Sequence, residues 1–497
     1  MNVQQAKPLN ARERAIALKQ QHDQRAFWLD VVLDSPVLLV ILGAAHFALA
    51  FYVRESQPGW SALHSLIPLA VGLYFATNRR IPVIYAAYIA AYIAGCEVMW
   101  RQNEFATFWE SGKYFSSLIL FAAWLRDKKP KLTWAPALYL LFLLPGILLT
   151  VVQLFDVKSM LSSNATGPLS LFVMVVFFST QRLTSSEIRR LFTAFALPVV
   201  GIAGIVIYRV NNLDITWTGD SNNEVSGFGA NQISSALSMA WFFLAAMTLG
   251  FFSGRERLLN YALAVGVAIW MVVATFFTFS RGGLIGSGAA LIVMMVLMLG
   301  VPSRRMAVAF ALAGVALFSA IIFPSLDNTT QGRMASRFSA ESTDEDLTTH
   351  RARLIQQEIQ VFLKYPITGV GVGQGKAVRD AEFDFLSSSH TEYTRLLAEH
   401  GILGLGANIV LVIIVIQAIR KQETWQGRAL SAALIAWGLI YMTHSATRTV
   451  EPSLAIGLAC AALAVDRTES AVAKAEPRDV SLHQGALARK RAEPITP

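Results

Sequence analysis

The chain has 497 residues, of which 54% are hydrophobic and only 15% are charged. Soluble proteins carry about 25% charged residues. Here the apolar residues occur in blocks of about 20, which is long enough to cross the hydrocarbon core of a bilayer. This composition excludes a secreted enzyme, a soluble nucleotide-binding enzyme and a disordered protein. The two cysteines, Cys96 and Cys460, both lie in apolar runs, which excludes a disulfide framework or a cysteine metal site.

The apolar segments predict an all-α polytopic membrane protein with about 12–14 transmembrane helices. In chain order, the fourteen segments are 34–53, 60–76, 82–98, 112–125, 135–155, 168–180, 191–208, 231–252, 259–279, 284–300, 306–323, 401–419, 429–443 and 451–465.

Charge distribution predicts the orientation of these helices. With the N-terminus in the cytoplasm, the short inner segments contain 27 Lys and Arg residues and the short outer segments contain seven. Basic residues are concentrated in cytoplasmic loops of membrane proteins. We therefore expect both termini in the cytoplasm, and we assign the net charge of +9 to inner loops beside membrane lipids, with no nucleic-acid partner.

The same segments predict the organisation of the chain. We expect a cytoplasmic segment (1–33), transmembrane helices 1–11 (34–323), a long periplasmic loop (324–400), C-terminal transmembrane helices (401–465) and a disordered cytoplasmic tail (466–497). Loops of more than about 15 residues are uncommon and often functional. The outer segments 211–230 and 324–400 exceed this length. Together with the short outer turn 444–451, they are the segments in which we look for functional residues.

Ser280-Arg281-Gly282-Gly283 lies at the outer end of the ninth span. Its two glycines would let the chain turn and let a ligand approach closely. Further on, Asp344-Glu345-Asp346 resembles a DxD metal motif only weakly, and a solvated acidic loop explains it better. We therefore predict neither a metal site nor a cofactor.

Helical periodicity is present from His350 to Tyr365. Arg351 falls on the apolar stripe and would need an anionic partner. Arg353 falls on the polar face, so we expect its charge to be solvated. The stripe consists of Ile355, Ile359, Phe362 and Leu363. After Pro366, the glycine-rich run 369–375 fails the dinucleotide fingerprint. It is either a backbone that approaches a ligand or a re-entrant turn.

Ser389 and Glu392 have the spacing of a capping box, so they predict a helix that ends before Gly401. Glu392 is then mainly structural. His390 would lie in the first turn, where the helix dipole favours neutral imidazole, so it is a candidate general base.

Arg448 lies in the outer turn 444–451, where a salt bridge with Glu451 is the simplest role. Arg281, Arg351, Arg448 and His390 nevertheless share the outer face, and guanidinium groups suit phosphate oxygens. Ser280, Arg353 and Glu392 are secondary candidates.

These motifs resemble the O-antigen ligase and O-antigen polymerase family of bacterial membrane glycosyltransferases, over about residues 210–450. The matching pieces are 279–283, the helix that leads from Arg351 into 365–371, and 390–405. Departures are Thr391, where the family commonly has Asn, and Ile355, near which it has an aromatic residue.

The resemblance implies a metal-independent, inverting transfer on the periplasmic side of the inner membrane. The donor would be a glycan on undecaprenyl diphosphate. His390 would activate the acceptor hydroxyl, and Arg281 and Arg351 would bind the diphosphate. We add Arg448 to the diphosphate-binding residues because the predicted topology places it in an outer turn.

The acceptor stays open. Lipid A–core would make the chain a ligase, which is the first choice. A second lipid-linked glycan would make it an O-antigen or exopolysaccharide polymerase, and a protein hydroxyl would make it an O-oligosaccharyltransferase. A transporter or flippase would need ionisable groups near the bilayer midplane, but Asp34, Glu97 and Lys113 lie near predicted span ends. A purely structural scaffold would not explain the long loop.

Overall fold

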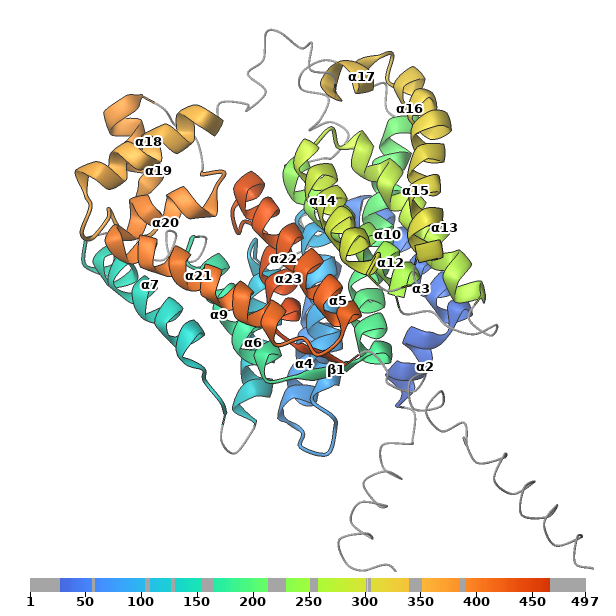
Figure 1. Ribbon diagram of the computed structural model, residues 1–497, viewed down its shortest axis with the longest axis horizontal. Coiled ribbons are helices and arrows are strands. Elements are labelled where there is room, and N and C mark those ends of the chain that lie inside the picture. The colour runs from blue at the N-terminus through green and yellow to red at the C-terminus, as the bar shows by residue number, and fades with distance from the viewer. Residues whose placement is uncertain are drawn as a thin grey trace, which may run out of the picture.

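The computed structural model describes residues 27–55, 59–102, 108–126, 130–153, 164–212, 229–250, 258–300, 302, 305–338, 351–384 and 389–464. Most of these residues are helical, which confirms the predicted all-α membrane protein (Figure 1). Residues 1–26, the acidic run 344–346, most of the segment 211–230 and the tail 466–497 lie outside the described residues.

The elements of the first half are α2 (Trp28–Asp34), α3 (Pro36–Glu55), α4 (Gly59–Thr77), α5 (Ile84–Gln102), α6 (Ser111–Leu125), α7 (Trp134–Gln153), α9 (Thr166–Ser179), β1 (Arg182–Thr184), α10 (Ser185–Asn212) and α12 (Ala230–Gly250). The second half contains α13 (Leu258–Phe277), α14 (Arg281–Met298), α15 (Arg305–Leu317), η3 (Phe318–Ile322), α16 (Phe323–Thr329), α17 (Arg333–Phe338), α18 (Arg351–Lys364), α19 (Gly375–Phe383), α20 (Glu392–His400), α21 (Ile402–Arg420), α22 (Trp425–Ser445), α23 (Glu451–Ala459) and β2 (Ala462–Ala464).

Each of the fourteen predicted apolar segments coincides with a helix. This follows from the bilayer, where a spanning segment must satisfy its backbone hydrogen bonds internally. Seven helices of the described ranges are long and apolar enough to cross a membrane, or eight if the pair α2–α3, bent by 85°, counts as one span. Other apolar helices, such as α6 and α23, are shorter, so the number of spans stays a prediction.

Close helix pairs form the centre of the molecule: α14 packs on α22, α5 on α10, and α9 on α23. Glycine permits two of these approaches. A Cβ atom on Gly95 would meet the backbone carbonyl of Phe195, and one on Gly457 would meet Met174. Small residues at helix crossings are typical of membrane proteins. Helices from the beginning and the end of the chain therefore share one core.

Helices α18, α19 and α20 form a small unit beside α7 and α21, at the end of the molecule predicted to face outward (Figure 1). Val361, Val370 and Ala398 make its apolar core. The Thr150 hydroxyl of α7 donates to the Val372 carbonyl at 3.1 Å. This contact ties the unit to a candidate membrane span.

The glycine-rich run 369–375 is a packed connector between these helices. Val370 N donates to Ala398 O, and Gly371 N donates to Glu399 O, both at 3.0 Å. Gly369, Gly371 and Gly373 all have positive φ angles, which only glycine adopts without strain. These bonds and angles support the predicted turn, and Gly373 of the same run also lines a polar cavity.

Strands β1 and β2 pair in parallel at the opposite end of the molecule (Figure 1). The Gln422 side chain supports them: its amide donates to Ala461 O at 2.8 Å, and its Oε1 accepts from Leu463 N at 2.9 Å. The chain after α23 is thus fixed to the segment that precedes α10.

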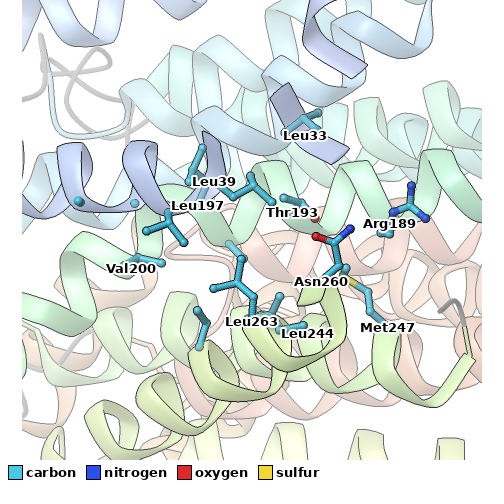
Figure 2. A pocket seen from close by; sticks show the side chains of 16 residues that line it. Leu33, Leu39, Arg189, Thr193, Leu197, Val200, Leu244, Met247, Asn260 and Leu263 are labelled. Carbon is cyan, nitrogen blue, oxygen red and sulfur yellow. The ribbon is translucent and has the colours of Figure 1, made fainter. Parts of the chain in front are cut away.

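An apolar groove of about 280 Å³ lies among α3, α10, α12 and α13 (Figure 2). Leucines such as Leu197 and Leu263 line it, and Arg189 and Asn260 lie towards one end. None of the predicted site residues lines this groove, so it is separate from the candidate site.

Candidate functional site

Arg281 is the first residue of α14, and Ser280 is its N-cap. The Ser280 hydroxyl donates to Asn231 Oδ1 at 2.9 Å and lies 3.2 Å from His444 Nε2. Phe279, just before them, is buried and has a φ angle of 52°. A left-handed conformation costs a non-glycine residue about 1 kcal/mol or more, so the surrounding packing must hold this turn. Ser280 therefore orients the start of α14.

The glycines that follow Arg281 do not make the expected turn. Both lie inside α14. A Cβ atom on Gly282 would collide with the His444 ring, and one on Gly283 would collide with the Ser234 hydroxyl. The two glycines therefore let α22 and α12 approach α14, which brings the residue after Arg281 against the His444 ring.

Arg351 is the first residue of α18 and is half-buried, whereas Arg353 is exposed, as the polar-face assignment predicted. The predicted apolar stripe is nevertheless wrong as the buried face, because Ile359 and Leu363 are 40% and 68% exposed. The residues that the helix buries are Leu354, Gln357, Glu358 and Val361.

Glu358 explains this difference, because its carboxylate is fully satisfied inside the protein. It accepts hydrogen bonds from the Ser389 hydroxyl at 2.5 Å and from Arg379 at 3.1 Å, and also from the Thr394 hydroxyl. A buried carboxylate is tolerated when it is paired in this way. Glu358 joins α18, α19 and α20 and fixes the residue before His390.

The predicted capping box is also wrong. Thr391 is the N-cap of α20, and its side chain accepts from Thr394 N at 3.3 Å. The Ser389 hydroxyl is already bonded to Glu358, so the hydroxyl of Thr391, which is nearer to the helix in the chain, caps it instead. His390 therefore precedes the helix rather than lying in its first turn.

Glu392 has a structural role, as expected, although it is not part of a capping box. Its carboxylate pairs with Arg395 at 2.6 Å. It also accepts from the Thr447 hydroxyl at 3.0 Å and from Thr447 N at 3.2 Å. These bonds join α20 to the turn 446–450, in which Arg448 lies.

His390 has the electrostatics of a neutral base. Burial lowers its pKa to about 4, and the charges of Arg448 and Arg351 act in the same direction, while a hydrogen bond to the backbone of His444 opposes them. The Nδ1 atom is buried without a hydrogen-bond partner among the described residues. A neutral imidazole offers one unprotonated nitrogen as an acceptor, so this side chain can take a proton.

Arg448 lies directly beside His390. Its guanidinium donates to Ser389 O at 2.9 Å, and Ala446 N donates to His390 O at 2.9 Å. Within the described chain no ion pair joins Arg448 to Glu451, so the simple salt bridge does not form. Burial, together with the charges of Arg395 and Arg351, lowers the pKa of Arg448 to about 10, although the Glu358 charge opposes this. Several guanidinium groups thus share one small volume, which favours an anionic ligand there.

The structure therefore brings most of the predicted residues together. His390, Arg448 and Arg351 interact electrostatically. His390 contacts His444, which contacts Ser280 next to Arg281. Arg353 is exposed on α18 and is not part of this cluster.

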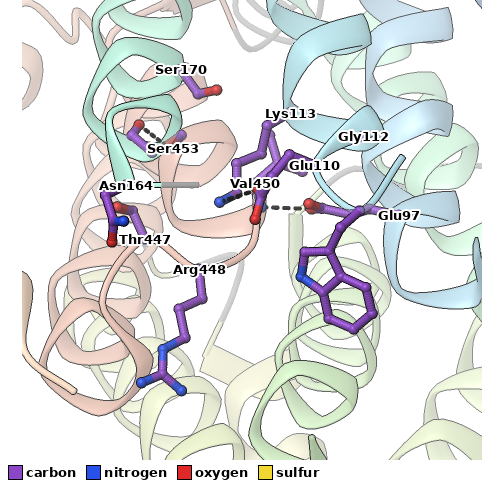
Figure 3. A network of polar contacts seen from close by, with 12 residues as sticks. Glu97, Glu110, Gly112, Lys113, Asn164, Ser170, Thr447, Arg448, Val450 and Ser453 are labelled. Carbon is purple, nitrogen blue, oxygen red and sulfur yellow. Dashed lines mark hydrogen bonds and ion pairs between the residues drawn. The ribbon is translucent and has the colours of Figure 1, made fainter. Parts of the chain in front are cut away.

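A buried ionic network beside the turn that carries Arg448 was not predicted (Figure 3). Arg101 pairs with Glu97 at 2.5 Å and with Glu110 at 3.2 Å, and Lys113 pairs with Glu110 at 2.6 Å. Arg101 also donates to the Arg448 carbonyl at 3.0 Å. The available signal was the pair of opposite charges four residues apart near the end of an apolar segment, Glu97 and Arg101.

A polar cavity of about 530 Å³ adjoins this cluster. It lies between α19, α20 and the turn 446–448 and extends to Arg101 and Trp109. Its other lining residues are Glu110, Asn164, Gln232, Gly373, Lys376, Ala377, Asp380, Ser389, Arg395 and Glu399. Burial raises the pKa of Glu399 to about 7, although the Arg395 charge opposes this. A carboxyl group with a shifted pKa in a cavity is typical of a functional site.

In the part of the chain that the structure describes, no group of three or more His, Cys, Asp or Glu residues is placed to hold a metal ion. The charged groups available for catalysis in this region are the guanidinium groups, the imidazole and the cavity carboxylates described above.

Comparison with known proteins adds one match. Residues 266–409 match the family model described as O-Antigen ligase. No curated protein matches the chain. The matched segment includes Arg281, Arg351 and His390, the residues on which the resemblance was based, whereas Arg448 lies beyond it. Residues 266–409 of this membrane protein are therefore similar to the O-antigen ligase family, the family that the sequence motifs resemble.

Proposed function

We propose that the chain is a glycosyltransferase of the bacterial inner membrane, with its active site on the periplasmic side. It would move a glycan from undecaprenyl diphosphate to an acceptor hydroxyl. Lipid A–core is the preferred acceptor, because the matched family model is described as O-antigen ligase. The observation that carries the proposal is the buried Nδ1 atom of His390, which has no partner among the described residues and lies near the charges of Arg351 and Arg448.

In this mechanism His390 removes the proton from the acceptor hydroxyl. The acceptor oxygen attacks the anomeric carbon from the side opposite the diphosphate, so the configuration inverts. The bond between that carbon and the diphosphate oxygen breaks, and undecaprenyl diphosphate leaves with the electron pair. Arg281, Arg351 and Arg448 stabilise the negative charge that develops on it. Guanidinium groups supply this charge, so the scheme needs no metal.

A deletion strain complemented with variants tests this function. We expect His390→Ala to lower transfer roughly 100-fold or more, as for loss of a general base, and Arg351→Ala to lower it by a similar factor through lost charge stabilisation. Arg353→Ala is the matched control, since it removes an exposed arginine from the same helix. Full activity of His390→Ala at normal protein levels would contradict the proposal and favour a transport role.

The same strain separates the ligase from its main alternative, an O-antigen or exopolysaccharide polymerase. Loss of long glycan from lipid A–core, with a long ladder left on the lipid carrier, indicates a ligase. Single repeat units that still reach the core, or that accumulate on the carrier, indicate a polymerase whose acceptor is a second lipid-linked glycan.

A further inference from the structure

We propose that the polar cavity of about 530 Å³ beside His390 binds the terminal sugars of the acceptor glycan. This inference rests on the proposed function and assigns the acceptor side of the site. The volume falls within the range of about 300–1,000 Å³ typical of ligand pockets.

The position of the cavity suits an acceptor. Ser389, Ala446 and Arg448 form one wall. Ser389 precedes the base in the chain, and Ala446 is hydrogen-bonded to the His390 carbonyl. His390 is not itself among the lining residues, so a sugar in the cavity would approach it past Ser389 and Ala446.

The charges of the cavity are mixed. Three acidic residues, Glu110, Asp380 and Glu399, and four basic ones, Arg101, Lys376, Arg395 and Arg448, line it. Of the three arginines assigned to the donor's diphosphate, Arg281 and Arg351 are not among the lining residues, and only Arg448 is. We therefore expect most of the diphosphate contacts outside the cavity, with Arg448 at the boundary between the two ligands.

The lining groups match the chemistry of sugar hydroxyls, which both donate and accept hydrogen bonds. The Nε atom of Arg395 is buried without a partner among the described residues, so it can donate to a ligand. Carboxyl oxygens of Glu399 and the exposed Asp380 can accept. Trp109, half exposed, offers an apolar ring face of the kind that orients a ligand in a pocket.

The ion pairs of Arg101 and Glu110 hold the side of the cavity that these two residues form. In Figure 3, Glu97, Glu110 and Lys113 gather beside the turn that carries Thr447 and Arg448. Arg101 donates to Gln232 Oε1 at 2.9 Å, and Glu97 accepts from Val450 N at 2.7 Å. A site held in this way needs little reorganisation when a ligand binds.

Helix α19 offers matched pairs of variants for a test. Asp380→Ala removes a lining carboxylate, and Glu382→Ala removes one from the same helix that pairs with Lys364 outside the cavity. Ala377→Trp fills the cavity with a large ring, and Ala381→Trp places the same ring at an exposed position that does not line it.

The assay uses the purified full chain, an undecaprenyl-diphosphate-linked repeat unit as donor, and lipid A–core or a second lipid-linked unit as acceptor. We expect Asp380→Ala and Ala377→Trp to raise the KM for the acceptor about 10-fold or more, as for loss of a hydrogen bond to a charged group. The KM for the donor and both control variants should stay within about 2-fold of wild type.

A rise in the donor KM alone, or no change in either KM, would overturn the assignment of the cavity while the enzyme remains a transferase. Failure of the wild-type chain to transfer to either acceptor, or full activity of His390→Ala, would instead overturn the proposed function, and this inference with it.

Discussion

His390 differs from a surface histidine in three respects: it is partly buried, it lies near two guanidinium charges, and one ring nitrogen has no partner among the described residues. Burial and both charges disfavour the protonated ring. The imidazole is therefore neutral at pH 7, as a general base must be before it takes a proton.

The pH dependence of transfer follows from this environment. With a pKa of about 4 for His390, we expect kcat/KM to stay constant from neutral pH down to roughly pH 5 and to fall through pH 4. An acidic limb near the ordinary value of about 6.5 that persists in a Glu399→Gln variant would contradict the buried environment of His390, because Glu399 has a pKa of about 7.

Stability must be followed in the same experiment. The unfolded chain binds the His390 proton at higher pH than the folded chain does, so this group lowers the free energy of unfolding as the pH falls from about 6.5 towards 4. Thermal unfolding at each pH separates this loss from protonation of the base.

The buried pair of Glu358 and Arg379 gives a second prediction. Both side chains are fully buried, so Glu358→Ala removes the carboxylate that pairs with a buried guanidinium. We expect a loss of about 3–5 kcal/mol, measured as faster hydrogen exchange across α18–α20. The double variant Glu358→Met, Arg379→Met leaves no unpaired charge and should recover most of this stability. Equal loss in both variants would contradict the ion-pair explanation.

Sequence analysis selected Arg351 rather than Arg353 from an apolar stripe that is not the buried face of α18. Arg351 is half-buried because it lies three and seven residues before Leu354 and Glu358, which the helix does bury. The sequence could not select Glu358, because a buried carboxylate depends on Ser389, Arg379 and Thr394, which lie 21 to 36 residues away along the chain. Arg101 was missed for the same reason, since its contact with Arg448 spans 347 positions.

Helix α14 approaches α22 only because position 282 lacks a side chain. Gly282→Ala would drive a methyl group into the His444 ring. We expect it to displace Arg281 and to lower transfer roughly 100-fold, as for a misplaced catalytic group. Gly288→Ala is the control in the same helix, because nothing lies within 4 Å of its added Cβ atom. Equal activity of the two variants would show that the contact with His444 is not needed.

The positions of the helices were predictable because hydrophobicity over about 20 residues decides what a bilayer accepts. Their ends were less predictable. Two hydroxyls, Ser389 and Thr391, compete to cap α20, and only the tertiary bond from Ser389 to Glu358 decides between them. The glycines at 282 and 283 were misjudged because the sequence does not show which helix lies opposite.

For the whole molecule, orientation in the membrane can be measured with single cysteines. The native Cys96 and Cys460 are buried. Lys364 in α18 and Arg182 in β1 have side chains that are 55% and 63% exposed, at opposite ends of the molecule. In intact cells, a membrane-impermeant maleimide should label Lys364→Cys but not Arg182→Cys, and permeabilised cells should label both. The reverse pattern would invert the predicted topology.

The contacts that complete the site have a consequence for biosynthesis. Glu97 accepts from Val450, which the ribosome adds 353 residues later, and β1 pairs with residues that follow the last described helix. Until α22 and α23 have been synthesised and inserted, Arg101 has no Arg448 carbonyl to bind, and His390 lacks the wall formed by the turn 446–450. A nascent or prematurely terminated chain therefore lacks these contacts, and under the proposed function we expect it to transfer no glycan.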